Sequence, residues 1–347
     1  MPRVPWVDLP ASVRDWAERS LGSPVAAAAS QPGGFSPGAA CRLRLADGRR
    51  AFLKAVSASA NPHSPGMHRR EGAVAAALPP DVPAPALLGQ YDDGEWVALL
   101  FADVDGVPPA EPWQLPQLGQ VLDAMAELHR VCTPSPVERV PSVADYLAED
   151  LSGWRKFAAL GPASPQPDDP ADPHRDGPAG SYQDANGGPH QDRPAGLHPD
   201  LLAGLDGWSA RHLDRLAELE SRWPAAAAGT TLLHSDVRAD NMLITDEGVV
   251  FVDWPHACLG VPWFDVVAFA PSVAMQGGPD PEWVLRHAGS ADGADPDAVT
   301  AVVAAVAGYF TRQALLPDPP GLPTVRAFQA AQGEPARAWL RRRTGWR

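Results

Sequence analysis

The first hundred residues alternate between short apolar runs and turn-forming residues. Apolar side chains alternate over Cys41–Leu45, a turn follows at Asp47 and Gly48, and a second apolar run covers Ala51–Val56. This period and turn chemistry predict a β-hairpin. Glycine-containing and proline-rich turns separate three more predicted elements, the helix Met67–Leu78 and the strands Ala86–Tyr91 and Trp96–Phe101.

Beyond residue 103 the hydrophobic period becomes helical. Apolar residues recur at helical spacing in Gln117–Val131 and Trp208–Trp223, and Ala298–Leu316 is a further helix candidate. A strand-rich segment followed by a helix-rich one is typical of an α+β fold in two lobes. We therefore expect an N-terminal nucleotide-binding lobe at residues 1–103 and a mainly helical catalytic and acceptor-binding lobe at residues 104–347.

One segment of the second lobe lacks any hydrophobic pattern. Residues 161–199 contain nine prolines, six glycines and six aspartates, and their only large apolar side chains are Tyr182 and Leu197. Such a segment has too little surface to bury to offset its conformational entropy. We expect residues 161–199 to form a disordered insertion.

Composition excludes several classes of protein. Acidic residues outnumber basic ones by 42 to 28, giving a net charge of −14, whereas a nucleic-acid partner calls for a basic surface. The three cysteines are scattered, which favours neither a disulfide framework nor a cysteine metal site. No apolar run is long enough for a membrane span, and the first residues lack the apolar core of a signal peptide. We expect a cytoplasmic protein that binds neither nucleic acid nor membrane; no oligomeric state is predicted.

The most informative motif lies between Thr231 and Asp253. It reads His-x-Asp-x4-Asn, then a strand, a turn and a second strand that ends at Asp253. A hairpin of this kind brings Asn241, which precedes the first strand, close to Asp253, while Asp236 lies on the loop leading in. Singly, each residue is an ordinary turn former. Together, an amide and a carboxylate oxygen suit Mg²⁺, which keeps its other positions for phosphate and water.

Lysine usage points to a second candidate. Only Lys54 and Lys156 occur among the 28 basic residues, in a chain rich in Arg, Ala, Pro and Gly. A lysine retained in such a sequence indicates a place where the planar arginine fork cannot replace a compact ammonium, unless it survives by chance. Lys54 lies in the second strand of the predicted hairpin.

These motifs resemble those of the aminoglycoside phosphotransferase and choline kinase family, which has the protein-kinase-like fold. The resemblance rests on HSDVRADN at residues 234–241 and on Val-Asp-Trp at residues 252–254, and it extends over Ser30–Phe269 apart from the insertion. It implies that Asp236 is the catalytic base or orients the attacking hydroxyl, and that Asn241 and Asp253 hold magnesium. It also implies a structural role for Asp265.

The same resemblance implies a site for ATP, or for GTP in its place. It assigns a phosphate-covering loop rich in glycine, a strand lysine that holds the phosphates, a helix glutamate that pairs with this lysine, and two backbone positions beside the adenine. The residues in these places are Gly33, Gly34, Lys54, Glu71, Ala102 and Val104.

Two other kinase classes fit less well. The chain has no G-x-x-x-x-G-K-[ST] motif, which excludes a P-loop kinase. Only 11 residues separate Asp253 from Asp265, too few for the segment on which a peptide substrate docks. The sequence therefore indicates a phosphotransferase that uses ATP and Mg²⁺ and has an alcohol group of a small molecule as acceptor.

The acceptor itself is less closely defined. The net charge of −14 and acids of the second lobe favour a cationic antibiotic such as an aminoglycoside. Two alternatives remain: a metabolic kinase of a sugar, nucleoside, amino alcohol or homoserine, and a catalytically silent kinase-like protein that binds a ligand. The acids considered are Asp145, Glu149, Asp150 and Asp265.

Overall fold

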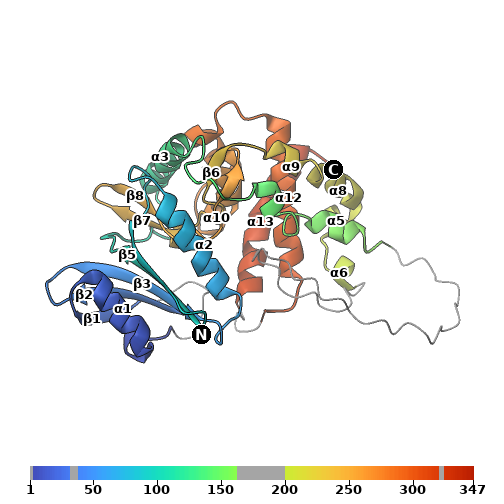
Figure 1. Ribbon diagram of the computed structural model, residues 1–347. Coiled ribbons are helices and arrows are strands. Elements are labelled where there is room, and N and C mark those ends of the chain that lie inside the picture. The colour runs from blue at the N-terminus through green and yellow to red at the C-terminus, as the bar shows by residue number, and fades with distance from the viewer. Residues whose placement is uncertain (1–2, 32–37, 162–199, 320–323) are drawn as a thin grey trace, which may run out of the picture.

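The predicted α+β fold with two lobes is observed (Figure 1). The computed structural model describes residues 3–31, 38–161, 200–319 and 324–347. A sheet with two helices forms the N-terminal lobe, and helices make up most of the rest. The predicted insertion lies outside the described residues except for Gly161, and the domain boundary at residue 103 stays a prediction.

One antiparallel sheet of five strands forms the centre of the N-terminal lobe, in the order β1-β2-β3-β5-β4. The predicted hairpin is confirmed: Cys41 pairs with Leu53, and Gly48 has the positive φ of 88° that the tight turn requires. The strands are β1 (Val25–Ser30), β2 (Ala39–Leu45), β3 (Arg50–Ser57), β4 (Leu87–Asp92) and β5 (Trp96–Ala102).

Two helices pack on this sheet. Helix α1 (Ala11–Leu21), for which the sequence gave no prediction, buries Val13, Ala17 and Leu21 at helical spacing among the sheet residues. Helix α2 (Ser64–Ala77) agrees with the helix predicted at Met67–Leu78 and contacts β3, β4 and β5. Its buried residues include Glu71, so this helix carries a carboxylate beside β3, the central strand of the sheet.

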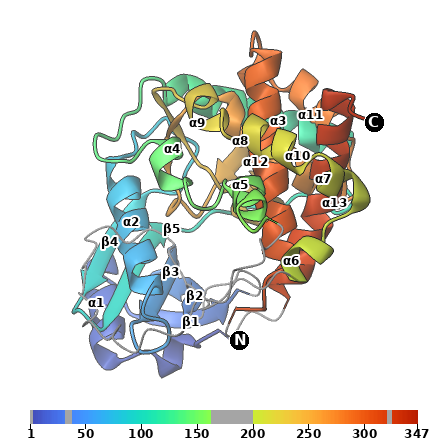
Figure 2. The same ribbon diagram turned by 90° about the vertical axis from the view of Figure 1, so that its right-hand side faces the viewer.

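The second lobe is built on long apolar helices. Helices α12 and α13 run side by side in both views and pack closely against each other, and α10 packs on both (Figures 1 and 2). The helices of eight or more residues are α3 (Leu115–Val131), α8 (Leu213–Glu220), α10 (Trp263–Met275), α12 (Pro296–Ala314) and α13 (Val325–Thr344). The shorter ones are α4 (Val143–Tyr146), α5 (Gly153–Ala158), α6 (Asp200–Ala203), α7 (Gly207–Arg211), α9 (Trp223–Ala226) and α11 (Pro281–His287).

The prediction of one helix over Trp208–Trp223 is wrong. The chain forms α7, α8 and α9 there, and at His212 the backbone leaves the helical range with φ −110° and ψ 13°. The ring of His212 packs against Trp208 and against Trp346 near the C-terminus, with centroids 5.1 and 5.5 Å apart. The hydrophobic period of the sequence carries no information about this aromatic contact between distant residues.

Short strands position the loops of the second lobe. Strand β6 (Thr231–Leu233) pairs with β9 (Cys258–Gly260), and β7 (Met242–Thr245) pairs with β8 (Gly248–Phe251), as the motif predicts. A bridge between Val107 and β7 connects this hairpin to the chain that leaves the N-terminal sheet. Short 3₁₀ helices occur at Trp6–Asp8, Ala239–Asn241 and Gly289–Ala291. Among the described residues, no helix is both long and apolar enough to span a bilayer.

Candidate active site

Three of the predicted site residues meet between the lobes. The ammonium of Lys54 on β3 lies 2.6 Å from Glu71 Oε1 on α2 and 2.8 Å from Asp253 Oδ1, directly beyond the β7–β8 hairpin. The backbone N–H of Trp254 also helps to stabilise the charged form of Glu71 and acts to lower its pKa. The three side chains come from elements far apart in sequence, so the tertiary fold brings both lobes to one charged cluster.

The cluster keeps Lys54 and Asp253 charged. Burial alone would lower the pKa of Lys54, but the charges of Asp253 and Glu71 outweigh it and raise this pKa. Burial would likewise raise the pKa of Asp253, and the adjacent ammonium instead holds it well below its usual value. Glu71 is more deeply buried, and this burial raises its pKa despite the contact with Lys54. The ammonium of Lys54 is thus held between the two lobes, in a position where it can bind an anionic ligand.

The hairpin explains why Asn241 and Asp253 lie together. Met242 pairs with Phe251, and Val252 N–H donates to the carbonyl of Asn241 at 2.9 Å. The residues flanking the two strands therefore emerge at one end of the hairpin. Asp253 has a positive φ of 70°, which is uncommon for a residue with a side chain and is typical of functional positions.

Asp236 is tied to the same hairpin end. The Nδ2 group of Asn241 donates to the backbone oxygen and to Oδ2 of Asp236, both at 2.8 Å. Arg238 approaches the other carboxylate oxygen at 3.4 Å and forms a second ion pair with Asp240. The Asp236 side chain is about a quarter exposed, at 27%. It is held in one orientation and remains open to a substrate.

A buried network supports the loop that carries Asp236. Asp265 on α10 is fully buried and accepts hydrogen bonds from the backbone N–H groups of His234 and Ser235, both at 2.9 Å. Ser235 has a positive φ of 62°, a conformation that these two bonds stabilise. His129 on α3 lies 3.1 Å from the same carboxylate. Asp265 is therefore a support for the loop.

His234 links this support to the hairpin. Its ring Nε2 lies 3.0 Å from the carbonyl of Val252, and its Nδ1 accepts a bond from the N–H of Asp236 at 3.3 Å. Its ring packs against the buried Trp254, with centroids 4.7 Å apart. The backbone at Asp236 and the backbone just before Asp253 are thereby set relative to each other.

The donor set suits a hard divalent cation. Because Asn241 uses its amino group on Asp236, its amide oxygen is left as an acceptor. The Asp253 side chain is 44% exposed, so its second oxygen is accessible. These two oxygens fit Mg²⁺, which binds few protein ligands and completes its shell with phosphate and water. Among the described residues there is no cluster of three His, Cys, Asp or Glu side chains that would serve a softer metal.

The chain between the lobes is shaped by arginines of the sheet. Ala102 N–H is still paired within the sheet, to Ala86 O at 2.8 Å, whereas Val104 lies just beyond β5. The carbonyl of Val104 accepts bonds from Arg42 Nη2 at 2.7 Å and from the N–H of Gly106. This carbonyl is thus already used, and Val104 could offer a nucleotide base its N–H.

The glycine loop is described only at its end. Gly33 and Gly34 lie outside the described residues, so their predicted role stays a prediction. At Gly38 a Cβ atom would lie 2.1 Å from the carbonyl oxygen of Ala55, the neighbour of Lys54. Only glycine allows the loop to approach β3 this closely.

One of the four acids predicted to attract a cationic acceptor does not lie at the surface. Asp265 is buried under the loop that carries Asp236, which removes it from any acceptor site. Asp145 accepts hydrogen bonds from Ser142, and Glu149 pairs with Lys156 at 2.9 Å. Of the four, Asp150 is the one whose charge acts together with that of Asp236 on Tyr309. The expectation of an acidic acceptor surface is wrong for Asp265.

Sequence reasoning missed several residues of the site. Arg238 stood inside the quoted motif, and Arg70 stood next to Glu71, but neither has a spacing signal of its own. Arg70 Nη2 donates to the carbonyl of Ala257 at 2.7 Å, and its guanidinium lies 4.1 Å from the ring centre of Tyr146. His129 lies on the apolar face of a helix, where a buried histidine is unremarkable without the structure.

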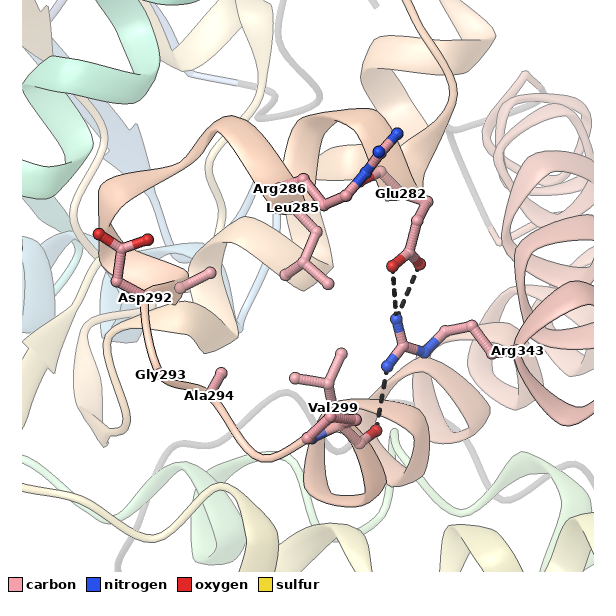
Figure 3. Close-up of a pocket in the computed structure, with 10 residues that line it drawn as sticks. Glu282, Leu285, Arg286, Asp292, Gly293, Ala294, Val299 and Arg343 are labelled. Carbon is pink, nitrogen blue, oxygen red and sulfur yellow. Dashed lines mark hydrogen bonds and ion pairs between the residues drawn. The ribbon is translucent and has the colours of Figure 1, made fainter.

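A separate hollow lies away from this cluster. Its volume is about 230 Å³, and Figure 3 shows the ion pair of Glu282 and Arg343 at its edge. Arg343 also donates to the carbonyl of Pro296, which connects α11, α12 and α13. None of the predicted site residues lines it, and its charged pair serves the packing of these helices.

Comparison with known proteins agrees with this geometry. A family model described as "Phosphotransferase enzyme family" matches residues 32–302. No curated protein matches the chain.

Solved structures of similar fold cover nearly the whole chain. One is a thermostable mutant of aminoglycoside phosphotransferase APH(4)-Ia in a ternary complex with AMP-PNP and hygromycin B. The two folds agree with a TM-score of 0.54 and 14% identity, over 96% of this chain and 98% of that chain. Another is a choline/ethanolamine kinase family protein from Mesorhizobium loti (TM-score 0.52, 15% identity, 94% of each chain). A third is an amicoumacin kinase in complex with AMP-PNP, Ca²⁺ and Ami (TM-score 0.50, 12% identity, 91% of this chain and 88% of that chain). At these identities the likeness describes the fold.

Proposed function

Because the chain belongs to the phosphotransferase enzyme family, we propose that it is an ATP- and Mg²⁺-dependent O-phosphotransferase acting on a hydroxyl of a small molecule. The observation that supports this most strongly is the position of Lys54, within 2.8 Å of both Glu71 and Asp253. Phosphoryl transfer needs positioned charges more than covalent chemistry. A buried ammonium between a helix carboxylate and a metal-binding carboxylate meets that need.

In this proposal the nucleotide lies between the lobes. Lys54 binds its phosphate oxygens, Glu71 holds the lysine in place, and the chain around Ala102 and Val104 meets the base. Gly33 and Gly34 belong to the loop that covers the phosphates. The base is adenine in our proposal, and GTP is the alternative nucleotide. AMP-PNP in the structures of similar fold agrees with an adenine nucleotide.

Asn241 and Asp253 would hold the Mg²⁺ ion through the two oxygens described above. When bound, the ion neutralises negative charge on the phosphates. Asn241 has a second task, since its amino group orients Asp236.

Asp236 receives the acceptor hydroxyl. Its carboxylate is fixed by Asn241 and Arg238, is partly exposed, and lies on the loop beside the metal-binding hairpin end. It can accept the proton of the hydroxyl or orient that hydroxyl toward the phosphate. Asp265, His129 and His234 keep the loop in this geometry without touching the reactants.

The acceptor is a small hydroxylated compound, and an antibiotic is our first candidate. One protein of similar fold is an aminoglycoside phosphotransferase in complex with hygromycin B and another is named an amicoumacin kinase, which agrees with that choice. A metabolic kinase of a sugar, nucleoside, amino alcohol or homoserine is the second candidate. Intact Lys54, Asp236 and Asp253 argue against a silent ligand-binding protein, which would need none of them.

The test is a comparison of wild type with Asp236→Asn. The wild type should consume ATP in the presence of at least one acceptor from a panel of aminoglycosides, peptide and nucleoside antibiotics, choline, homoserine and sugars. Asp236→Asn should still bind Mg²⁺ and AMP-PNP but lose roughly 10²- to 10⁴-fold in kcat. Turnover within threefold of wild type would show that Asp236 is not the residue that receives the hydroxyl.

A further inference from the structure

The end of α12 and the start of α13 form a wall that reaches Asp236 through Arg238. Tyr309 of α12 marks this wall. Burial raises the pKa of its hydroxyl, and the charges of Asp150 and Asp236 raise it further. Tyr309 therefore stays a neutral hydroxyl in the field of the carboxylate proposed to receive the acceptor.

Arg326, in the first turn of α13, is fixed beside Tyr309. Its Nη1 donates to Gln313 Oε1 at 2.7 Å and to Gln329 Oε1 at 2.8 Å, and its Nε donates to Pro317 O at 3.0 Å. Gln329, which is buried, in turn donates to the Tyr309 hydroxyl at 3.4 Å. The guanidinium is thus oriented by neutral acceptors alone.

The charge of Arg326 remains uncompensated at short range. Among the described residues, no carboxylate forms an ion pair with Arg326 and its Nη2 group has no hydrogen-bond partner. The exposed Asp318 acts on it only through its longer-range field. A half-buried arginine whose Nη2 group has no partner within the described chain can donate hydrogen bonds to an acceptor atom of a ligand.

The same turn of α13 reaches the catalytic loop. The guanidinium of Arg238 lies 5.9 Å from the ring centre of Phe328, which stands next to Gln329 on α13. Arg238 also contacts Asp236. The wall that holds Arg326 is therefore connected to the residue that receives the hydroxyl.

We propose that Arg326 binds an anionic group of the acceptor, so that the preferred acceptor is an alcohol that also carries a carboxylate or a phosphate. This inference rests on the proposed function, since it assumes that the acceptor occupies the side of Asp236 that faces α12 and α13. It differs from the sequence-based expectation of a polycationic acceptor. Antibiotics and metabolites that bear a carboxylate remain within the proposed class.

A binding measurement tests the anion site independently of the acceptor's identity. With the nucleotide site saturated by AMP-PNP and Mg²⁺, inorganic sulfate should raise the melting temperature of the wild type more than that of Arg326→Gln. The general salting effect of sulfate acts on both proteins and cancels in the comparison. Arg44→Gln, at an exposed position on β2, should respond as the wild type does. An equal response of wild type and Arg326→Gln overturns the proposal.

Turnover gives the second test and separates the two sources of anion. Glucose, glucuronate and glucose 1-phosphate share ring hydroxyls but differ in charge, and homoserine and hygromycin B extend the panel. An anionic member should be the best acceptor, and Arg326→Gln should raise its KM roughly tenfold or more with a smaller change in kcat. Arg326→Lys should recover part of this loss because the charge is kept.

The outcomes distinguish this inference from the proposed function. A preference for hygromycin B or glucose that Arg326→Gln leaves unchanged overturns the inference, while the loss of turnover in Asp236→Asn would still support the kinase. Full turnover in Asp236→Asn would instead contradict the proposed function, whatever Arg326 does. If no panel member is phosphorylated, the sulfate comparison decides the inference.

Discussion

At the scale of single residues, the two lysines have different surroundings. Lys54 is enclosed by Glu71 and Asp253, whereas Lys156 forms a partly exposed pair with Glu149. A compact ammonium with two close carboxylates is a place where the wider arginine fork would not fit without moving its neighbours. The retention of lysine at position 54 therefore has a physical reason. The partly exposed pair of Lys156 with Glu149 gives no such reason for a lysine at position 156.

Asp253 carries the first residue-scale prediction. Asp253→Ala should weaken the binding of AMP-PNP in the presence of Mg²⁺ by roughly 10- to 100-fold, the range known for damaged metal sites. The reason is that the amide oxygen of Asn241 alone is a poor partner for a hard cation. Calorimetry with and without Mg²⁺ measures the effect.

The control is Asp246→Ala, an exposed aspartate at the other end of the same hairpin. It should bind nucleotide as the wild type does. If Asp253→Ala kept both its affinity and its dependence on Mg²⁺, Asp253 would only cap the end of β8.

At the scale of elements, helix α2 connects the two halves of the site. Glu71 faces Lys54, and the preceding Arg70 reaches across to Ala257 and to Tyr146 on α4. Tyr146 also bonds to His256 at 2.9 Å, just beyond Asp253. The position of α2 is thus set by the helical lobe as well as by the sheet on which it packs.

Arg70→Ala should therefore lower kcat/KM for ATP by roughly 5- to 30-fold, as expected if a partly buried cation–π contact and a hydrogen bond contribute about 1–2 kcal/mol to the active arrangement. Steady-state kinetics give this value. Arg69→Ala is a matched control, because Arg69 pairs with Asp92 on the exposed side of the helix and such pairs contribute little. Equal kinetics for the two variants would show that α2 keeps its position without the Arg70 contacts.

At the scale of the whole molecule, two separate hydrophobic cores share one active site. One core joins α1 to the sheet, and the other fills the helical lobe. Between them lie the Lys54–Asp253 ion pair, the contacts of Arg70 and the bridge from Val107 to Ile244. Apolar packing adds to these connections, since Val74 of α2 and Val82 belong to the core of the helical lobe. A ligand that contacts both lobes should change how strongly they are coupled.

Hydrogen exchange tests this coupling. AMP-PNP with Mg²⁺ should slow amide exchange both in β3 of the sheet and in the β7–β8 hairpin, because Lys54 and Asp253 contact the same ligand in the proposed function. In Lys54→Ala the added protection of β3 should be smaller than that of the hairpin. Protection confined to one lobe in the wild type would contradict a nucleotide site between the lobes.

The sequence by itself determined much of the local structure and the identity of the central residues. The β2–β3 hairpin, α2 and the β7–β8 hairpin follow from short-range periodicity and turn chemistry, which act within a few residues. The motif between Thr231 and Asp253 predicted that Asn241 and Asp253 lie at the same end of one hairpin. The pairing of two adjacent strands fixes that geometry. The family, and with it the two-lobed fold, followed from the same motif.

Only the tertiary structure decided which charges face each other. Whether Asp265 lies in an acceptor site or under the catalytic loop depends on the packing of α10, and periodicity carries no information about that. Where the predicted helix breaks, His212 packs on Trp346, and the guanidinium of Arg326 is oriented by Gln313 of α12 and Gln329 of α13. Burial and long-range contacts are properties of the folded chain, and for this reason the anion-binding role proposed for Arg326 has no signal in the sequence.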